Sequence, residues 1–159
     1  MRLRPPYRKP LEEYCREHSL DPFVVAALIR QESEFNVKAV SRANARGLTQ
    51  VMPATGRELG RKLKIPRYQT SMLFTPDMNL KIGTYYLKVL LDQLNGKWEQ
   101  TLASYNAGKS RVNSWVASAN YHEPAEFVES IPFSETRLYV QSVMRNAEVY
   151  RRLYGQKAR

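Results

Sequence analysis

The sequence predicts an all-α fold, and three observations support this prediction. Apolar residues recur at three- and four-residue intervals over most of the chain. A capping residue followed by proline occurs at Asp21-Pro22 and at Thr75-Pro76, which is typical of a helix start. No stretch alternates apolar and polar residues as a half-buried strand would. With 159 residues, 43% of them hydrophobic, the chain has the size and composition of one compact domain over residues 1–159.

The first half of the chain predicts three helices. A short surface helix is expected over residues 6–19, where apolar residues at helical spacing interrupt charged ones. The second helix starts at Asp21-Pro22 and ends near Phe35. Because residues 23–29 are apolar on all sides, it should be buried at the centre of the fold. A loop follows over residues 36–47, then a third helix over 53–63 and a connection over 64–71.

The second half predicts a long leucine-rich helix that begins after Thr75-Pro76 and stops at Asn95-Gly96. Four more helices are expected: 98–105, 111–119, 126–131 and one that starts at Ser134. The last of them carries one apolar stripe, made of Val140, Val143, Met144, Ala147, Tyr150 and Tyr154.

Composition limits the possible functions. The chain has 25 Lys and Arg residues against 15 Asp and Glu residues, and the net charge of +10 indicates attraction to a polyanion. Cys15 is the single cysteine, so no intrachain disulfide can form. With only His18 and His122, far apart in the sequence, a Cys/His metal cluster is excluded and only carboxylate sites stay open. We expect no metal and no cofactor.

No membrane span or signal peptide is predicted. The longest apolar run, residues 23–29, is too short to cross a bilayer, and no apolar region follows the basic N-terminal residues. Either the protein is cytoplasmic, or the chain is a domain excised from a longer precursor.

The basic residues gather in three clusters, which together with ten tyrosines and two tryptophans would suit a nucleic-acid surface. The clusters are Arg2, Arg4, Arg8 and Lys9; Arg57, Arg61, Lys62, Lys64 and Arg67; and Arg145, Arg151, Arg152, Lys157 and Arg159. Most tyrosines fall on helical stripes and no helix-turn-helix is evident, so solvated helix faces are the favoured interpretation and no nucleic-acid partner is expected.

Glu32 is the strongest candidate for chemistry. It lies in the last turn of the apolar helix, on the face that carries Val25, Leu28 and Ile29. Burial and the negative end of the helix dipole should both raise its pKa, as a general acid requires. The alternative is that Glu32 simply points into water beside Glu34.

Polar residues follow in the next loop and at a later helix end. Ser41, Gln50 and Met52 could line a cleft wall, or belong to an ordinary loop with a methionine filling the core. Tyr105 and Asn106 end a helix, where asparagine followed by glycine is also a usual stop signal.

Five segments match one known family in order. They are ALIRQES (27–33), Ser41, GLTQVMP (47–53), SYNAG (104–108) and IPFSETRLYV (131–140). Together they resemble the catalytic domain of soluble lytic transglycosylases, in glycoside hydrolase family 23. The resemblance runs from about residue 6 to the last helix. It implies a compact lysozyme-like helical domain with a substrate cleft, related to goose-type lysozyme.

The resemblance implies cleavage of the β-1,4 bond between N-acetylmuramic acid and N-acetylglucosamine in peptidoglycan glycan strands. Glu32 would protonate the glycosidic oxygen and then, as a carboxylate, accept the proton of the muramic acid C6 hydroxyl as that oxygen closes onto C1. The product is a 1,6-anhydromuramic acid end, and no water is consumed. One glutamate would replace the usual pair of carboxylates.

By the same resemblance, six further residues would bind substrate. Ser41 would orient the muramoyl sugar, Gln50 and Met52 would line the glycan groove, and Tyr105 would assist Glu32. Asn106 would contact sugar, and Glu135 would lie farther along the cleft, unless it serves only to stabilise the last helix.

Three positions depart from the family pattern. Thr49 replaces a larger apolar residue, which puts groove shape or packing there in question. Asn44 replaces a common glycine and tolerates a left-handed backbone better than most residues. Ser104 replaces a common alanine.

The family works on the cell wall, so we expect a periplasmic or cell-envelope location, a domain cut from a longer precursor, and a monomer. Two alternatives stay open. One is a hydrolytic goose-type muramidase, in which water attacks C1. The other is a non-catalytic basic module that binds glycan or nucleic acid.

Overall fold

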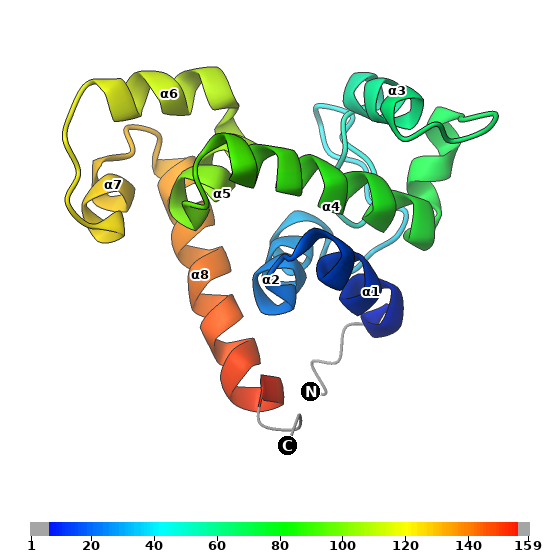
Figure 1. The fold of residues 1–159 in the computed structure, drawn as a ribbon, viewed down its shortest axis with the longest axis horizontal. Helices are drawn as coiled ribbons and strands as arrows, with labels where there is room; N and C mark the ends of the chain where they lie inside the picture. The colour runs from blue at the N-terminus through cyan, green and yellow to red at the C-terminus, as the bar shows by residue number, and fades with distance from the viewer. Residues whose placement is uncertain (1–6, 156–159) are drawn as a thin grey trace. The chain divides into compact units, whose positions relative to one another are not determined.

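The computed structural model describes residues 7–155, and helices dominate them (Figure 1). The elements are, in order, α1 (Arg8–His18), α2 (Pro22–Ser33), α3 (Pro53–Lys62), the 3₁₀ helix η1 (Thr70–Phe74), α4 (Pro76–Gln93), α5 (Trp98–Ala107), α6 (Lys109–Ala117), α7 (Pro124–Ser130) and α8 (Ser134–Tyr154). Within residues 7–155 the only β pairing consists of two isolated bridges, Val40 with Arg46 and Arg46 with Val51. The all-α prediction is confirmed.

The chain divides into two compact units, the first ending at Tyr86 and the second beginning at Leu87, inside α4. Each unit contains its own buried residues and part of the predicted site. No helix in the described part of the chain is long and apolar enough to cross a membrane.

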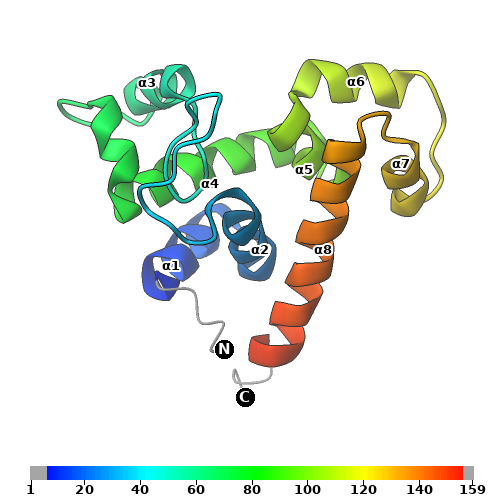
Figure 2. The ribbon, with the colours of Figure 1, turned by 180° about the vertical axis from the view of Figure 1, so that it is seen from behind.

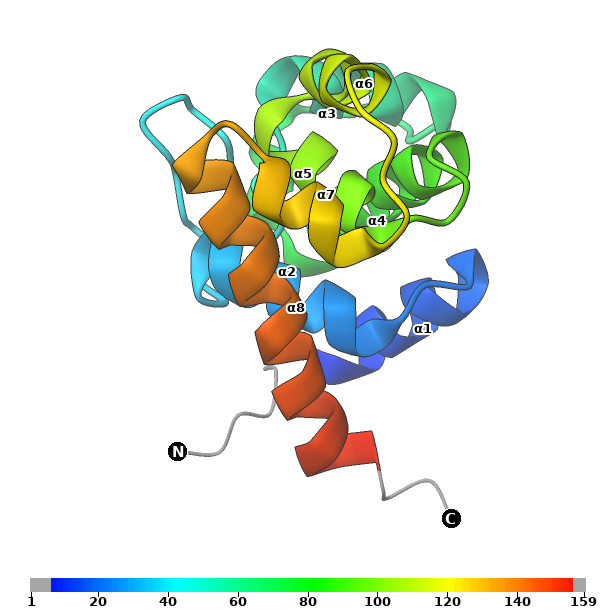
Figure 3. The ribbon, with the colours of Figure 1, turned by 90° about the vertical axis from the view of Figure 1, so that its left-hand side faces the viewer.

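In the first unit, α2 forms as its sequence predicts. The Asp21 carboxylate accepts a hydrogen bond from the Phe23 N–H at 2.9 Å, and Pro22 occupies the first helical position. Every residue from Val24 to Ile29 is buried. Helix α1 packs against α2, as Figure 3 shows. It buries Leu11 and Cys15.

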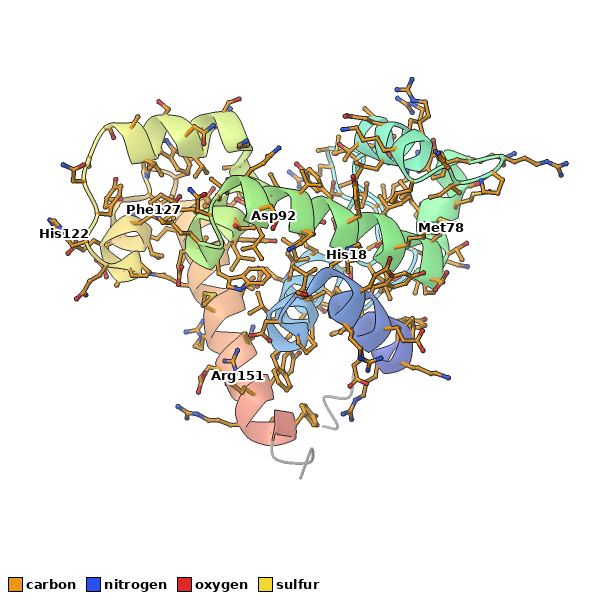
Figure 4. The ribbon with its side chains drawn as sticks, in the orientation of Figure 1. His18, Met78, Asp92, His122, Phe127 and Arg151 are labelled. Atoms are coloured by element: carbon orange, nitrogen blue, oxygen red, sulfur yellow. The ribbon has the colours of Figure 1, made fainter. Side chains whose placement is uncertain are left out.

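The other part of the first unit is a cluster between α3, η1 and the first half of α4. Its buried members are Val51, Leu59, Ile65, Leu73 and Ile82. Partly buried side chains surround them, among them Met78 on α4 (Figure 4). This cluster packs the chain from Val51 to Leu73 against the first half of α4.

In the second unit, α5 contacts α6, α7 and α8, and Figure 2 shows α8 beside these shorter helices. The predicted stripe of α8 is confirmed in its centre, since Val140, Val143, Ala147 and Tyr150 are buried. Two stripe residues at the margin, Met144 and Tyr154, are half-buried.

Several helix boundaries differ from the prediction by one or two residues. Helix α5 continues through Asn106 to Ala107, and α6 starts at Lys109 directly after Gly108. One element was not predicted at all: η1 lies at the end of what the sequence indicated as a connection. Short 3₁₀ helices lack the repeated apolar spacing that reveals a long helix.

Candidate active site

Glu32 lies in the last turn of α2 and is half-buried. The helix ends because Glu34 and Phe35 both adopt left-handed backbone angles, with φ of 51° and 63°. The neighbouring Ser33 is buried, and its hydroxyl lies 3.1 Å from the Ile29 carbonyl oxygen and 2.8 Å from the Leu48 carbonyl oxygen. This hydroxyl therefore ties the end of α2 to the following loop at the position next to Glu32.

Ser41 lies on the exposed part of that loop. Its hydroxyl oxygen accepts a hydrogen bond from the Ala45 N–H at 3.0 Å, and its own N–H donates to the Ala45 carbonyl at 3.0 Å. Asn44, between them, has a left-handed φ of 72°, as its replacement of a common glycine suggested. The turn thus holds Ser41 at the surface in a fixed backbone conformation.

Gln50 stabilises the same loop through its side-chain amide. Its side-chain Nε2 donates to the carbonyl oxygens of Ala39 at 3.1 Å and Gly47 at 2.9 Å. Both amide hydrogens are used within the loop. Met52, two residues on, is 41% exposed and directly precedes Pro53, the first residue of α3.

Asn79 on α4 is a residue that the sequence analysis missed. It is fully buried, and its Oδ1 accepts hydrogen bonds from the Thr49 N–H at 2.9 Å and the Thr49 hydroxyl at 2.6 Å. Its Nδ2 donates to the carbonyl oxygens of Arg46 at 3.0 Å and Leu73 at 2.8 Å. The amide thus makes four hydrogen bonds, all it can offer. A lone asparagine in an apolar helix stripe was the signal available for it.

Thr49 is explained by this arrangement. The side chain is 2% exposed, bonds to Asn79 and packs against Gly83, where a Cβ atom would lie 2.2 Å from the Thr49 hydroxyl oxygen. The departure from the family pattern therefore affects packing between the loop and α4.

In the second unit, Tyr105 and Asn106 lie in the last turn of α5, and both are half-buried. The hydroxyl of Thr136, in α8, donates to the Asn106 Oδ1 at 2.8 Å. Thr136 is 2% exposed, so this bond holds the Asn106 amide from its buried side.

A basin of about 460 Å³ brings Asn106 and Glu135 together at the junction of α5, α6 and α8. Phe133 forms one wall and is 43% exposed. The Arg111 guanidinium lies 5.1 Å from the centre of its ring, and the Trp115 ring meets it edge-on at 5.3 Å. Glu135 is exposed in the first turn of α8, where a helix dipole also favours an acidic residue.

Other groups offer little alternative chemistry. Burial raises the pKa of the Cys15 thiol to about 12, so it stays protonated and unreactive near neutral pH. His18 is on α1 in the first unit and His122 precedes α7 in the second (Figure 4). Among residues 7–155, no group of three or more His, Cys, Asp and Glu side chains is arranged to hold a metal ion.

The first unit thus carries Glu32, Ser41, Gln50 and Met52, and the second carries Tyr105, Asn106 and Glu135. In the first unit, Ser33, next to Glu32, and Gln50 both hydrogen-bond to the backbone of the loop that follows α2, and in the second unit one basin is lined by Asn106 and Glu135. The fold and these residues define a helical protein in which a half-buried carboxyl group, at the end of an apolar helix, is the main candidate for acid–base chemistry.

Comparison with known proteins identifies the family of the chain. The family model described as "Transglycosylase SLT domain" matches residues 10–128, and the one described as "Soluble lytic transglycosylase helical domain" matches residues 130–158. The chain therefore belongs to the transglycosylase SLT domain family.

Relatives and solved structures agree with this assignment. The chain is 39% identical over 153 residues to the soluble lytic murein transglycosylase of Salmonella typhimurium, a match that covers 95% of the chain and 24% of the relative. The structure of an inactive mutant of the lytic transglycosylase Slt from Pseudomonas aeruginosa, with glutamine in place of a glutamate, superimposes with a TM-score of 0.91 at 36% identity, covering 97% of this chain and 25% of that one.

The 70 kDa soluble lytic transglycosylase of Escherichia coli also gives a TM-score of 0.91, at 37% identity, covering 98% of this chain and 26% of that one. The chain thus spans about a quarter of the length of these relatives.

Proposed function

We propose that this chain is the catalytic domain of a peptidoglycan lytic transglycosylase of glycoside hydrolase family 23, with a lysozyme-like fold. The observation that carries the proposal is the position of Glu32, half-buried in the last turn of an apolar helix, within a chain of the SLT family. The relatives named above are lytic transglycosylases, and that of Salmonella typhimurium is a lytic murein transglycosylase.

In the proposed reaction, the protonated Glu32 carboxyl donates its proton to the oxygen between N-acetylmuramic acid and N-acetylglucosamine, and the bond from C1 to that oxygen breaks. The resulting Glu32 carboxylate then takes the proton of the muramic acid C6 hydroxyl while O6 bonds to C1. The proton count balances, Glu32 returns to its acid form, and no water enters. One group serves as acid and then as base, so an elevated pKa would suit it.

The surroundings of Glu32 support this role. The Ser33 hydroxyl holds the end of α2 against the loop at Leu48, which limits movement of the catalytic carboxyl. In the Pseudomonas aeruginosa relative, a mutant with glutamine in place of a glutamate is inactive. A single essential glutamate is what the proposed mechanism requires.

The remaining substrate contacts are proposed as follows. Ser41 orients the muramoyl sugar, and Gln50 and Met52 line the glycan groove. Of these, Met52 offers exposed apolar surface, whereas Gln50 keeps only its Oε1 for a sugar hydroxyl because Nε2 bonds within the loop. Thus Gln50 would act in part by holding the loop in shape.

In the second unit, Tyr105 would assist Glu32, Asn106 would contact sugar and Glu135 would bind farther along the strand. The Asn106 Oδ1 already accepts a hydrogen bond from the Thr136 hydroxyl. The Asn106 Nδ2 is therefore the group that would donate to substrate. Peptidoglycan glycan strands would be the partner, in the periplasm or cell envelope, with the protein acting as a monomer without cofactor.

Mass spectrometry of the soluble products from purified peptidoglycan tests the proposal. Wild type should release products one water lighter than reducing muropeptides, and Glu32→Gln should lose at least about a hundredfold in turnover. Glu34→Gln is the matched control, because Glu34 lies two residues from Glu32 and its side chain is exposed. This variant should keep wild-type turnover.

Other results would point elsewhere. Reducing ends would make the protein a hydrolytic muramidase, with water attacking C1. Binding to peptidoglycan without release of any product would favour a non-catalytic module. Undiminished cleavage by Glu32→Gln would remove Glu32 from its role.

A further inference from the structure

The segment from Arg57 to Arg67 is strongly cationic, with five basic residues and one acidic residue, Glu58. Glu58 pairs with Lys62 at 3.2 Å, one helical turn away. The other four cations, Arg57, Arg61, Lys64 and Arg67, form no ion pair within the described part of the chain. Their charge is therefore available to an external anion.

Three of these cations surround one basin of about 750 Å³. Arg57 and Arg61, one turn apart on α3, share it with Lys64, and no acidic side chain lines it. Its remaining lining residues are Gly60, Ile65 and Tyr68. A concave surface with cations and no acid attracts anions more strongly than separate surface charges do.

The backbone at this basin is unusual. Lys64 follows the end of α3 with a left-handed φ of 53°, and Arg67 has the same value. The Lys64 N–H donates to the Arg61 carbonyl at 3.0 Å and the Ile65 N–H to the Gly60 carbonyl at 2.9 Å, a helix ending at which glycine is the favoured residue. Two cations thus occupy positions that glycine would occupy with less strain.

The helix dipole accounts for only part of this pattern. Cations in the last turn of α3, such as Arg61 and Lys62, are stabilised by its negative end. Arg57 lies in the first half of the helix and Arg67 lies five residues beyond its end, so neither benefits from that effect.

Tyr68 argues against a nucleic-acid ligand. Its ring lies over α3 so closely that a Cβ atom on Gly60 would be 2.8 Å from the ring, and one on Gly56 would be 2.5 Å from the phenol oxygen. One face of the ring is therefore covered by the helix. Base stacking needs open aromatic faces, and the lining of this basin offers at most the other face of this single ring.

We propose that the basin of Arg57, Arg61 and Lys64 binds the carboxylates of peptidoglycan stem peptides and so holds the protein on its substrate. This inference rests on the proposed function, which supplies an acidic polymer as the partner. None of the seven candidate site residues lines the basin. Within the first unit, α3 lies on the other side of the first half of α4 from α1 and α2 (Figures 1, 2 and 3).

The basin is therefore a second contact with the same polymer, separate from the residues that would act on its glycan. Binding through exposed cations is screened by salt, so the contact should weaken as ionic strength rises. Three such contacts, each of modest strength, amount to about a tenfold change in affinity.

Co-sedimentation with purified peptidoglycan at low and high salt tests the inference. The basin variant is Arg57→Gln/Arg61→Gln/Lys64→Gln. The charge-matched control replaces three cations that form no ion pair in the described residues: Arg16→Gln/Lys97→Gln/Arg145→Gln. Each variant lowers the net charge by three, so a difference between them reports position rather than total charge.

At low salt, the basin variant should bind intact peptidoglycan about tenfold more weakly than wild type, and the control within about twofold. On glycan strands stripped of their peptides, with the lactyl carboxylates that this step frees converted to amides, all three proteins should bind alike. At high salt, wild type should approach the basin variant.

Equal binding of the two variants to intact peptidoglycan would overturn the proposal, as would an equal loss on stripped strands. A loss of affinity confined to a single-stranded oligonucleotide probe would assign the basin to nucleic acid instead. Release of anhydro products by wild type is measured in parallel. Peptide-dependent binding through the basin without product would reject the proposed function alone, and product release with unaltered binding by the basin variant would reject this inference alone.

Discussion

The loop between α2 and α3 and the junction of α5, α6 and α8 hold their candidate residues in different ways. In the loop, buried polar side chains from outside it, Ser33 and Asn79, bond to its backbone. At the junction, the Thr136 hydroxyl bonds to Asn106, the Phe133 ring is exposed, and the Ser104 hydroxyl is buried with no hydrogen-bond partner among residues 7–155. The loop is therefore a preorganised backbone frame, whereas the junction presents side chains on packed helices.

The largest expected effect comes from removing the Asn79 amide, which bonds to the loop from α4. Asn79→Ala leaves the Thr49 N–H and hydroxyl and the Arg46 and Leu73 carbonyls without this partner in a buried site, so we expect unfolding to become easier by about 3–4 kcal/mol. Urea unfolding measures it. Asn113→Ala, on an exposed part of α6, is the control and should stay within about 0.5 kcal/mol of wild type. A similarly small effect of Asn79→Ala would show that the loop keeps its conformation without the Asn79 hydrogen bonds.

A pair of glycines separates backbone strain from close packing. Gly47 and Gly96 have nearly equal φ values, 78° and 76°, but a Cβ atom on Gly47 would lie 2.2 Å from the Leu73 carbonyl oxygen, while none lies within 4 Å of the same position on Gly96. Gly47→Ala should therefore cost about 2–3 kcal/mol of unfolding free energy and Gly96→Ala about 1 kcal/mol. Thermal unfolding of both variants checks this. Equal costs would mean that the loop moves freely away from η1.

The sequence predicted those parts of the fold whose signals are local. Asp21-Pro22 started α2 as expected, because the cap and the proline act within one helical turn. The burial of residues 24–29 followed from their apolar run. By contrast, η1 was missed because five residues are too few for a periodic pattern.

The sequence predicted which residues belong to the candidate site, but not how they are arranged in space. The position of Glu32 at the end of α2 followed from the helix pattern, whereas the proximity of Asn106 to Glu135 depends on the packing of α5 against α8. Asn79 was missed because its partners, Thr49 and Arg46, are 30 and 33 residues away in the sequence. Contacts over such separations leave no local pattern to interpret.

A smaller effect is expected at the junction, where removing one buried hydroxyl should stabilise the protein and removing another should destabilise it. Within the described part of the chain the buried Ser104 hydroxyl has no hydrogen-bond partner, so Ser104→Ala should raise the unfolding free energy by about 1 kcal/mol. Thr101, three residues earlier on α5, is equally buried but donates to the Lys97 carbonyl at 2.8 Å, so Thr101→Val should lower it by about 1 kcal/mol. Opposite signs in thermal unfolding are the expected result. A loss of stability in Ser104→Ala would indicate that the hydroxyl is satisfied in solution.

The smallest expected effect concerns an exposed hydrogen bond of the first unit, from the Tyr14 hydroxyl to the Asp77 carboxylate at 2.9 Å. Burial, followed by this bond and by the Asp77 charge, raises the pKa of Tyr14 from 10.0 to about 12. Because the folded pKa exceeds the unfolded one, the bond contributes its full stability below pH 10 and loses it as the pH rises toward 12. Solvent screening at this exposed position limits the contribution to less than about 1 kcal/mol.

The stability difference between wild type and Tyr14→Phe, measured by urea unfolding from pH 8 to pH 12, isolates this bond from the other groups that titrate in alkali. The difference should be constant up to pH 10 and then shrink. If it stayed constant to pH 12, the Tyr14 proton would not be linked to folding. The Tyr14–Asp77 bond would then differ from the buried bonds around the loop not only in exposure but also in contributing no stability that depends on the Tyr14 proton.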